Sequence, residues 1–479
     1  MDTDVTAPAD QSAAKTASKV SVQPGGPVRG TIRPPGSKSI TNRALICAGM
    51  TPGQSHLTGA LRSEDTAVMI DSLQRCGVQI SVEAAGTQLN VNGDCWANRA
   101  SSTVTERDCQ ELFIANSGTT VRFLTAALSA AGGHYQLQGV PRMHQRPIGD
   151  LIDALQPVQR GNLTALSADG CPPVLIQSQG WNGKTIQVGG SISSQYLSGL
   201  MMACPIAAGQ LQAATGKPQS ITVEVIGELV SKPYVDMTAN VMRSFGAEVQ
   251  LTYDDDATAE GVSATVTIDG NYQASQYAIE PDASAASYFW AAAAITGGEV
   301  TVEGLTPDAM QGDVGFCEVL AKMGCKLAVG SDSMTISGRA SQGIDIDMNA
   351  ISDTVQTLAV VALFADGPTR VRGVAHNRYK ETDRIGDLAT ELRKLGARVD
   401  EHEDGLTITP PPQSPSGSSL SPAVLETYHD HRMAMSLSLA GLRQPGVQIL
   451  DPACTGKTYP QFFADLEALI GRPHQWSME

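Results

Sequence analysis

Long apolar runs, aromatic residues and positive charge are all scarce in this chain of 479 residues. No apolar run approaches the roughly 20 residues that span a bilayer, so we expect no membrane partner. Aromatic residues make up 5% of the chain, too few for the platforms that stack single-stranded nucleic acid. The net charge of −16 opposes the basic face that a nucleic-acid-binding protein needs. An anion would therefore need a local basic pocket, which focuses its field on a small ligand.

Paired cysteines and targeting signals are also missing. The nine cysteines are scattered and form no CxxC pair, which indicates thiols in a reducing compartment rather than disulfides or a zinc site. The segment His429-Asp430-His431 lacks further ligands at the usual spacing, so we expect no metal. Residues 1–19 lack an apolar signal core and the Arg-rich character of a transit peptide. We interpret them as a disordered tail and expect a cytoplasmic protein.

The segment from Pro35 to Arg43, PGSKSITNR, carries unusual charge for its position. A Pro-Gly turn ends an extended segment there, and an apolar run predicts a helix from Ser39 to Gly49. Lys38 and Arg43 are thus expected in or near the first turn, where cations weaken a helix. An anionic ligand on the free N–H groups would explain them, and a solvated basic helix start is the alternative.

A unit of strand, helix, glycine, strand, turn and strand recurs along the chain. The glycines suit the position after a helix, where φ is positive, and the period indicates a repeated supersecondary unit. Four copies begin near residues 57, 223, 300 and 371, and a partial fifth runs from 137 to 155.

Several further helices lie between these copies and are nearly all apolar, which predicts burial. The sequence therefore predicts an α/β architecture with helices packed inside strands. A domain boundary is plausible near residues 271–279, and residues 410–422 are interpreted as a surface loop. The predicted inner helices cover residues 39–49, 118–131, 193–208, 283–296, 355–365 and 432–442.

Two of these helix starts are rich in groups that suit an anion or a sugar. Asn116-Ser117-Gly118 begins one of them, where Gly118 lets a ligand approach the backbone and Arg122 follows one turn later. An ordinary Ser or Asn cap is the alternative. The segment 191–196 begins the other with three hydroxyls and an amide, for which a Ser-rich cap is equally plausible.

Four positions in the second half carry charge beside apolar helices. The segment 380–384 combines both signs and is either an anion clamp with a proton-transferring carboxyl group or a surface ion pair. Arg432 begins a very apolar helix, so it needs an anion or Asp430 as partner. Asp353 precedes another apolar helix and could be a simple N-cap. Lys457 follows a glycine but lacks the earlier Walker A glycine, so ATP is not expected.

The cations of these motifs come from both halves of the chain, mostly from predicted helix starts. If the repeats share one topology, the starts face a common side. The two halves would then close a cationic cleft over a small, multiply anionic substrate pair. The set comprises Lys38, Arg43, Arg122, Arg146, Lys380, Arg384, Arg432 and Lys457.

Eight motifs in order give the chain a specific family resemblance. From about residue 20 to the C-terminus it resembles the 5-enolpyruvylshikimate-3-phosphate synthases, a family of enolpyruvyl transferases. The motifs are PGSKSITNRAL (35–45), NSGTTVR (116–122), PRMHQRPIGDL (141–151), GSISSQYL (190–197), SKPYVDMT (231–238), RYKETDRI (378–385), HDHRMAM (429–435) and DPACTGKTYP (451–460).

The resemblance implies a two-lobed inside-out α/β barrel, each lobe holding three βαβαββ repeats with buried helices and outer sheets. Lobe 1 would contain residues 20–36 and 278–479 and lie on the phosphoenolpyruvate side. Lobe 2 would be the inserted residues 37–277, on the shikimate 3-phosphate side.

The implied reaction transfers the enolpyruvyl group of phosphoenolpyruvate to the 5-hydroxyl of shikimate 3-phosphate and releases phosphate. It proceeds by addition and elimination through a tetrahedral ketal, without metal or organic cofactor, in chorismate and aromatic amino acid biosynthesis. Proton transfers and an anion clamp are required. A monomer is expected.

Matching motifs assign roles to individual residues. Asp353 would take the hydroxyl proton, Glu381 would exchange the proton at the methylene carbon, and Lys38 would serve the bridging or leaving oxygen. Shikimate 3-phosphate would be held by Lys38, Ser39, Arg43, Ser193, Ser194, Gln195, Ser231, Tyr234, Asp353 and Lys380. Phosphoenolpyruvate would be held by Lys38, Asn116, Gly118, Arg122, Arg146, Gln195, Arg384, Arg432 and Lys457.

One departure and two alternatives remain open. His376 stands where some members have a substrate-binding Asn, so its role is an open question. Gly118 keeps the small residue that leaves room for glyphosate in the family, and inhibition by glyphosate is a hypothesis. The alternatives are the sister transferase acting on UDP-N-acetylglucosamine, which the SKPY and GSISSQ segments disfavour, and a non-catalytic scaffold on the same fold.

Overall fold

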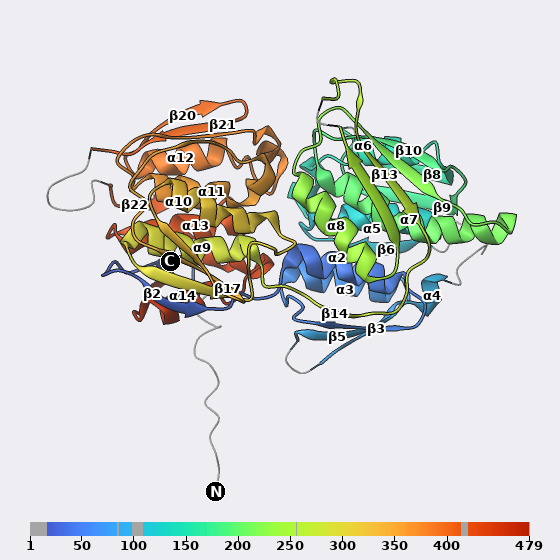
Figure 1. Ribbon diagram of the computed structural model, residues 1–479, viewed down its shortest axis with the longest axis horizontal. Helices are drawn as coiled ribbons and strands as arrows, with labels where there is room; N and C mark the ends of the chain where they lie inside the picture. The colour runs from blue at the N-terminus through green and yellow to red at the C-terminus, as the bar shows by residue number, and fades with distance from the viewer. Residues whose placement is uncertain are drawn as a thin grey trace, which may run out of the picture. The chain divides into compact units, whose positions relative to one another are not determined.

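The computed structural model describes residues 17–83, 86–97, 109–167, 169–254, 256–412 and 420–478. They form two compact units (Figure 1). Unit 1 contains the described residues up to Pro34, the segment Ala283–Ala309 and the residues from Asp313 onward. Unit 2 contains Pro35–Asp282 and the short segment Met310–Gly312. The expected loop at 410–422 lies mostly outside the described residues, as does most of the expected tail.

Unit 2 contains three four-stranded sheets, with strand orders β14-β3-β5-β4, β6-β7-β9-β8 and β10-β11-β13-β12. The strands are β3 (Gln54–Thr58), β4 (Gln79–Val82), β5 (Gln88–Asn92), β6 (Gln110–Phe113), β7 (Gly133–Gln138), β8 (Gln159–Ala165), β9 (Val174–Trp181), β10 (Thr185–Gly189), β11 (Ile221–Ile226), β12 (Glu248–Tyr253), β13 (Val262–Asp269) and β14 (Gln276–Ala278). The helices are α2 (Lys38–Gly49), α3 (Glu64–Arg75), α4 (Asp94–Ala97), α5 (Gly118–Ala131), η2 (Pro141–Gln145), α6 (Gly149–Leu155), α7 (Ser194–Thr215) and α8 (Lys232–Ser244).

Unit 1 also contains three four-stranded sheets, with strand orders β16-β17-β15-β2, β18-β19-β21-β20 and β22-β23-β1-β24. The strands are β1 (Lys19–Ser21), β2 (Arg29–Ile32), β15 (Glu299–Glu303), β16 (Lys326–Val329), β17 (Ser333–Ser337), β18 (Asp345–Asp347), β19 (Thr369–Arg372), β20 (Arg398–His402), β21 (Gly405–Thr409), β22 (Ala423–Leu425), β23 (Val447–Leu450) and β24 (Gln475–Ser477). The helices are α9 (Ala283–Thr296), η3 (Gly312–Gly315), α10 (Phe316–Lys322), η4 (Asn349–Thr354), α11 (Val355–Ala362), η5 (Ala375–Tyr379), α12 (Gly386–Lys394), α13 (His431–Ser438), η6 (Leu439–Leu442), η7 (Pro452–Lys457) and α14 (Phe462–Ile470).

The repeat that contains β10 to β13 shows why one sequence pattern recurs. Strands β10 and β11 are parallel and are joined by the largely buried helix α7, while β12 and β13 return antiparallel after α8. Alternate residues of β11 point inward, and α8 buries one face, so each repeat covers its apolar side with helices. Six sheets of this kind in the described residues confirm the predicted α/β fold with helices inside strands.

The repeat with the sheet β22-β23-β1-β24 is not recognisable as a continuous pattern in the sequence, because both ends of the chain contribute strands to it. Strand β1 pairs antiparallel with both β23 and β24, so the N-terminal segment supplies the last strand of the C-terminal repeat. The expected tail of residues 1–19 is thus wrong for its last residues, since Ala17 is buried and Lys19 begins β1. Residues 1–16 lie outside the described residues.

The chain passes between the units twice, after Pro34 and after Asp282. Backbone hydrogen bonds hold these two passages together, from Ser37 N to Glu280 O and from Asp282 N to Pro35 O, both 2.8 Å. The Glu280 carboxylate accepts from Met310 N and Gln311 Nε2 at 3.1 Å, which explains why 310–312 belongs to unit 2. Residues 35–36, 278–282 and 310–312 therefore pack with unit 2, whereas the sequence interpretation placed them in the other lobe.

Each unit has its own apolar core built around three buried helices. In unit 2 these are α2, α5 and α7, and in unit 1 they are α9, α11 and α13. Helix α9 has its first 13 residues buried and α5 is buried throughout, as expected of helices that are apolar on every side. Strands surround these helices in each unit (Figure 1). The N-terminal turns of the inner helices are where most candidate residues lie.

Candidate active site

Backbone strain marks the predicted motifs. Among the described residues, the non-glycine residues with positive φ are Ala115, Ser231, Tyr428, His429 and Asp451, with φ between 45° and 57°. Each lies inside or next to one of the motifs singled out from the sequence. Such backbone conformations cost of order 1–3 kcal/mol each and cluster at functional sites. Strain therefore supports these segments as the site, by an observation independent of their charge.

The start of α2 presents Lys38 beside a carboxylate. Ser37 caps the helix, with its Oγ 3.4 Å from Ile40 N, and the Asp282 carboxylate accepts from Lys38 N at 3.1 Å. Lys38 Nζ lies 3.8 Å from the buried Asp65 carboxylate, in the first turn of α3. No sequence pattern singles out Asp65, because an acidic residue in the first turn of a helix is ordinary.

Arg43 lies deeper than the sequence suggests. It sits in the second turn of α2 and is only 2% exposed, so it is not part of an open first turn. Its guanidinium donates to Thr238 Oγ1 at 2.7 Å, Ser198 Oγ at 3.1 Å and Ser39 O at 2.9 Å. Burial lowers the pKa of Arg43 to about 10, and no carboxylate of the described residues lies within ion-pair distance. The group stays charged at neutral pH and favours an anion nearby.

Arg122 and Arg146 converge on Gly118 at the start of α5. Arg122 Nη1 donates to Gln195 Oε1 at 2.7 Å, and Arg146 Nη1 donates to Asn116 O at 2.9 Å. A Cβ atom at Gly118 would lie 2.4 Å from Arg146 Nη2 and 2.9 Å from Arg122 Nη1. A side chain at this position would force the guanidinium groups to shift, so the glycine leaves room for two cations at one helix start.

The hydroxyl-rich residues of unit 2 lie at helix starts near Arg43 or Gln195. Ser193 caps α7, accepting from Gln195 N at 3.3 Å, and the next residue, Ser194, is buried. Ser231 adopts the left-handed conformation before α8 and is buried. The Tyr234 ring lies 5.9 Å from the Arg43 guanidinium carbon.

Arg384 is the centre of a buried charge network in unit 1. Asp430 accepts two hydrogen bonds from it, Nε to Oδ2 at 2.7 Å and Nη2 to Oδ1 at 3.1 Å. Glu381 Oε2 lies 2.9 Å from the same Nη2, and Asp353 Oδ1 lies 3.3 Å from Nη1. Burial opposes the charge of Arg384, but Asp430, Glu381 and Asp353 outweigh it and raise the pKa. A planar guanidinium held this way has a fixed orientation.

Arg432 and Lys457 extend the network at its two ends. Arg432 Nη2 lies 2.7 Å from Asp353 Oδ2, and Lys457 Nζ lies 2.8 Å from Glu381 Oε1. Asp430 caps α13 through Arg432 N at 2.8 Å. Asp353 and Glu381 are thus each held between two cations, an arrangement that favours the charged form of a carboxylate.

His376 lies on η5, and Lys380 directly follows this turn. His376 is 4% exposed, and burial lowers its pKa to about 3, with Lys380 adding to the shift and Asp353 opposing it. The imidazole is therefore neutral at physiological pH. Asn377 donates from Nδ2 to Ser352 O at 3.0 Å and so fixes the turn that carries Asp353. No sequence pattern marks Asn377, because its partner lies 25 residues earlier in the chain.

The expectation that these cations lie mainly at helix starts is only half right. Lys38, Arg43, Arg122 and Arg432 lie in the first two turns of α-helices. The others lie in the irregular segments between a strand and a helix, where short 3₁₀ turns form. Those four are Arg146 after η2, Lys380 after η5, Arg384 before α12 and Lys457 in η7.

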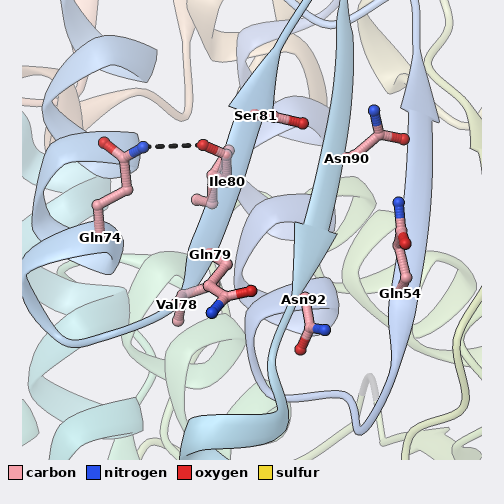
Figure 2. A pocket seen from close by; sticks show the side chains of 8 residues that line it. All are labelled: Gln54, Gln74, Val78, Gln79, Ile80, Ser81, Asn90 and Asn92. Carbon is pink, nitrogen blue, oxygen red and sulfur yellow. Dashed lines mark hydrogen bonds between the residues drawn. The ribbon is translucent and has the colours of Figure 1, made fainter.

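A cavity of about 470 Å³ on the first sheet of unit 2 has a different chemistry. Its lining comes from β3, β4, β5, the end of α3 and the turn between α3 and β4, and Figure 2 shows the amides of Gln54, Asn90 and Asn92 among its walls. Gln74 donates to the Ile80 carbonyl at 2.9 Å there. All eight lining residues are uncharged, so this cavity cannot clamp a phosphate or carboxylate as the cation clusters can.

Comparison with known proteins identifies the family to which the chain belongs. The family model for EPSP synthase (3-phosphoshikimate 1-carboxyvinyltransferase) matches residues 22–466. The chain belongs to this family. It is 42% identical over 443 residues to a 3-phosphoshikimate 1-carboxyvinyltransferase of Sulfurovum sp. (strain NBC37-1), covering 92% of this chain and 97% of that protein.

Other relatives carry the same name. A chloroplastic 3-phosphoshikimate 1-carboxyvinyltransferase of Brassica napus is 41% identical over 472 residues, covering 96% of this chain and 87% of that protein. A solved structure of EPSP synthase from Acinetobacter baumannii has a TM-score of 0.73 at 25% identity, covering 96% of this chain and 99% of the other. The structural likeness extends over both units.

Two further features bear on partners. Within the described residues, no helix combines the length and apolar character that crossing a membrane requires. The same residues contain no group of three or more His, Cys, Asp or Glu side chains arranged to bind a metal ion.

Proposed function

We propose that this protein transfers the enolpyruvyl group of phosphoenolpyruvate to the 5-hydroxyl of shikimate 3-phosphate and releases phosphate. Family membership supports the reaction. The arrangement that carries it is the chain of alternating charges Lys457, Glu381, Arg384, Asp353 and Arg432, with contacts of 2.7–3.3 Å. It combines anion-binding groups with two proton-accepting carboxylates, which this addition and elimination requires.

The two substrates each carry several negative charges. Phosphoenolpyruvate is assigned to Lys38, Asn116, Gly118, Arg122, Arg146, Gln195, Arg384, Arg432 and Lys457. Shikimate 3-phosphate is assigned to Lys38, Ser39, Arg43, Ser193, Ser194, Gln195, Ser231, Tyr234, Asp353 and Lys380. Arginine forks bind carboxylate and phosphate groups in pairs of hydrogen bonds, and the serine hydroxyls suit a polyol and its phosphate.

The proton transfers are assigned to three residues. Asp353 takes the proton of the attacking 5-hydroxyl, since Arg384 and Arg432 keep it ionised. Glu381 exchanges the proton at the methylene carbon: once substrate has drawn Lys457 away and Glu381 is protonated, it gives this proton in the addition step and takes one back from the new methyl group in the elimination. Lys38 supports the leaving phosphate. Substrate oxygens that bind Arg432 and Lys457 would compete with the two carboxylates and free them for these transfers.

Phosphate release measured with both substrates tests the reaction. We expect release with shikimate 3-phosphate and none when UDP-N-acetylglucosamine replaces it. The reverse result would favour the sister transferase, and no release with either would favour a scaffold. The same proposal includes a cytoplasmic location, a monomeric state and inhibition by glyphosate. Gel filtration checks the monomeric state, and an inhibition curve checks the effect of glyphosate.

Replacing Lys38 with Met tests the assigned role of the amine. We expect turnover to fall by at least about a hundredfold, the usual scale for losing one catalytic group. The fold should persist because Lys38 is the first residue of α2 and lies outside the apolar core, and circular dichroism can verify this. Near-normal turnover would contradict the assignment.

A further inference from the structure

A buried glutamate on α12 holds the turn that leads into the charge network. Glu391 is completely buried, although the segment around it is an ordinary amphipathic helix. Its Oε1 accepts from the Tyr428 hydroxyl at 2.7 Å, and its Oε2 accepts from Glu426 N at 2.9 Å. Lys394 Nζ donates to both oxygens at 2.7 and 2.8 Å. The carboxylate thus joins α12 to the segment 426–428.

That segment is strained where Glu391 holds it. Tyr428 and His429 are consecutive residues in the left-handed region, with φ of 54° and 55°. This conformation is unfavourable for a residue that has a side chain, so neighbouring contacts must hold the turn. The Glu391 bond holds Tyr428, and His429 Nδ1 lies 2.6 Å from Asp451 Oδ2 on its other side. Burial and then Glu391 raise the pKa of Tyr428, so the phenol keeps the proton that it donates.

The turn delivers Asp430, which orients Arg384 and caps the helix of Arg432. Two carboxylates therefore join the same two segments reciprocally. Glu391, after Arg384 in the chain, reaches the 426–428 segment, and Asp430, after that segment, reaches back to Arg384. These two sets of contacts share no atoms. The contacts of Glu391 with residues 426–428 can therefore set the geometry of the contact between Asp430 and Arg384.

We propose that Glu391 and Tyr428 are positioning residues, which hold the strained 428–429 turn so that Asp430, Arg384 and Arg432 keep the geometry of an anion site. This inference deepens the proposed function, and neither residue touches the reacting atoms. Its direct consequence concerns anion affinity, which can be measured without turnover.

The experiment compares Tyr428→Phe and Glu391→Gln with the wild type. The first removes one hydroxyl, and the second keeps the shape but loses the charge. Inorganic phosphate is titrated by its effect on thermal unfolding, and KM for both substrates is measured. We expect about fivefold weaker phosphate affinity and a similar rise in KM for phosphoenolpyruvate, the equivalent of one hydrogen bond. KM for shikimate 3-phosphate should change less than twofold, and the double variant should lose no more than Glu391→Gln alone.

Arg393→Met is the matched control. Arg393 also anchors α12, through two bonds to Val399 O of 2.7 and 3.2 Å, but has no bond to 426–428. It should lower the unfolding temperature without changing phosphate affinity. Equal phosphate affinities in Tyr428→Phe and wild type, or an equal loss in Arg393→Met, would overturn the proposal. A wild-type protein whose unfolding temperature does not change with inorganic phosphate would also overturn the proposal. Wild-type protein that binds phosphate but releases none from the substrates would refute the proposed function alone.

Discussion

Buried cations of the two units are stabilised by different groups. Arg384 lies against three carboxylates, so its charge is fully compensated inside unit 1. Arg43 lies against hydroxyl and carbonyl oxygens, so the described part of unit 2 leaves its charge uncompensated. A guanidinium of the second kind attracts an incoming anion, whereas one of the first kind is held in orientation by its partners. The two kinds suit different parts of anion recognition.

Gly118→Ala tests the packing of two guanidinium groups at one helix start. The added Cβ would lie 2.4 Å from Arg146 Nη2, so Arg146 and Arg122 must move. We expect KM for phosphoenolpyruvate to rise about tenfold, since a displaced charged hydrogen bond costs roughly 1.5 kcal/mol. Inhibition by glyphosate should weaken in parallel if it occupies the same space. Steady-state kinetics check this, and an unchanged KM would contradict the crowding argument.

His376 predicts a pH dependence of stability. A histidine in the unfolded chain titrates near pH 6.5, and burial lowers the folded pKa to about 3. Between these pH values the unfolded state binds a proton at His376 and the folded state does not. The contribution of His376 to the free energy of unfolding is therefore fully present above pH 6.5 and is lost as the pH falls. The slope approaches about 1.4 kcal/mol per pH unit.

Comparison with His376→Asn isolates this contribution, because other titrating groups are common to both proteins. Urea unfolding at pH 7.5, 6 and 5 should show the variant gaining stability relative to wild type as the pH falls. A difference that stays constant with pH would show that the imidazole is not held neutral.

Helix starts and the turns before them carry most of the candidate residues. A cap satisfies only part of the N–H groups at a helix start, and the others point along the helix axis away from the helix. The left-handed turns set where each helix begins. Helices α2, α5, α7 and α13 all begin at a residue whose side chain accepts from the first turn. Those caps are Ser37, Ser117, Ser193 and Asp430.

Ser37→Ala tests the cap of α2. Loss of the cap should lower the free energy of unfolding by about 1 kcal/mol. It should also reduce kcat, because Lys38 and Ser39 lie in the turn that frays. Ser178→Ala is a control in the same unit, where the lost hydroxyl bonds Ser129 O at 2.7 Å and Gly180 N at 3.1 Å. Equal kcat losses in both variants would show that stability alone explains the effect.

Each unit has a separate core, but only one is continuous in sequence. Residues 35–282 contain every strand of the three sheets of unit 2, whereas unit 1 needs β1 and β2 from before the insertion. Burial of a complete core is what stabilises a domain of this size.

Residues 35–282 expressed alone should therefore fold and unfold cooperatively on heating. Residues 283–479 alone should not, because two of their sheets lack a strand. Circular dichroism of the two fragments checks this. A cooperative transition in the second fragment and none in the first would contradict the division described here.

The sequence predicts those features of the structure that depend on residues close together in the chain, and not those that depend on contacts between distant residues. The glycine after each amphipathic helix, as at Gly77 and Gly324, is a local signal, and both have positive φ as expected. Lys38 and Arg384 were recognisable because their charge conflicts with their neighbours. Asp65 and Glu391 were not, because an acidic residue on a helix is unremarkable until its partner is known.

The amino-acid sequence by itself determined the repeat, the buried helices and the family, since periodicity, composition and ordered motifs are properties of the chain alone. The tertiary structure decided which distant residues meet. It placed β1 beside β23 to complete the sixth sheet, buried Arg43 beyond the first turn of α2, and set Asp430 against Arg384. Pairing across hundreds of residues depends on how sheets and helices pack, and burial in three dimensions fixes the cost of each charge.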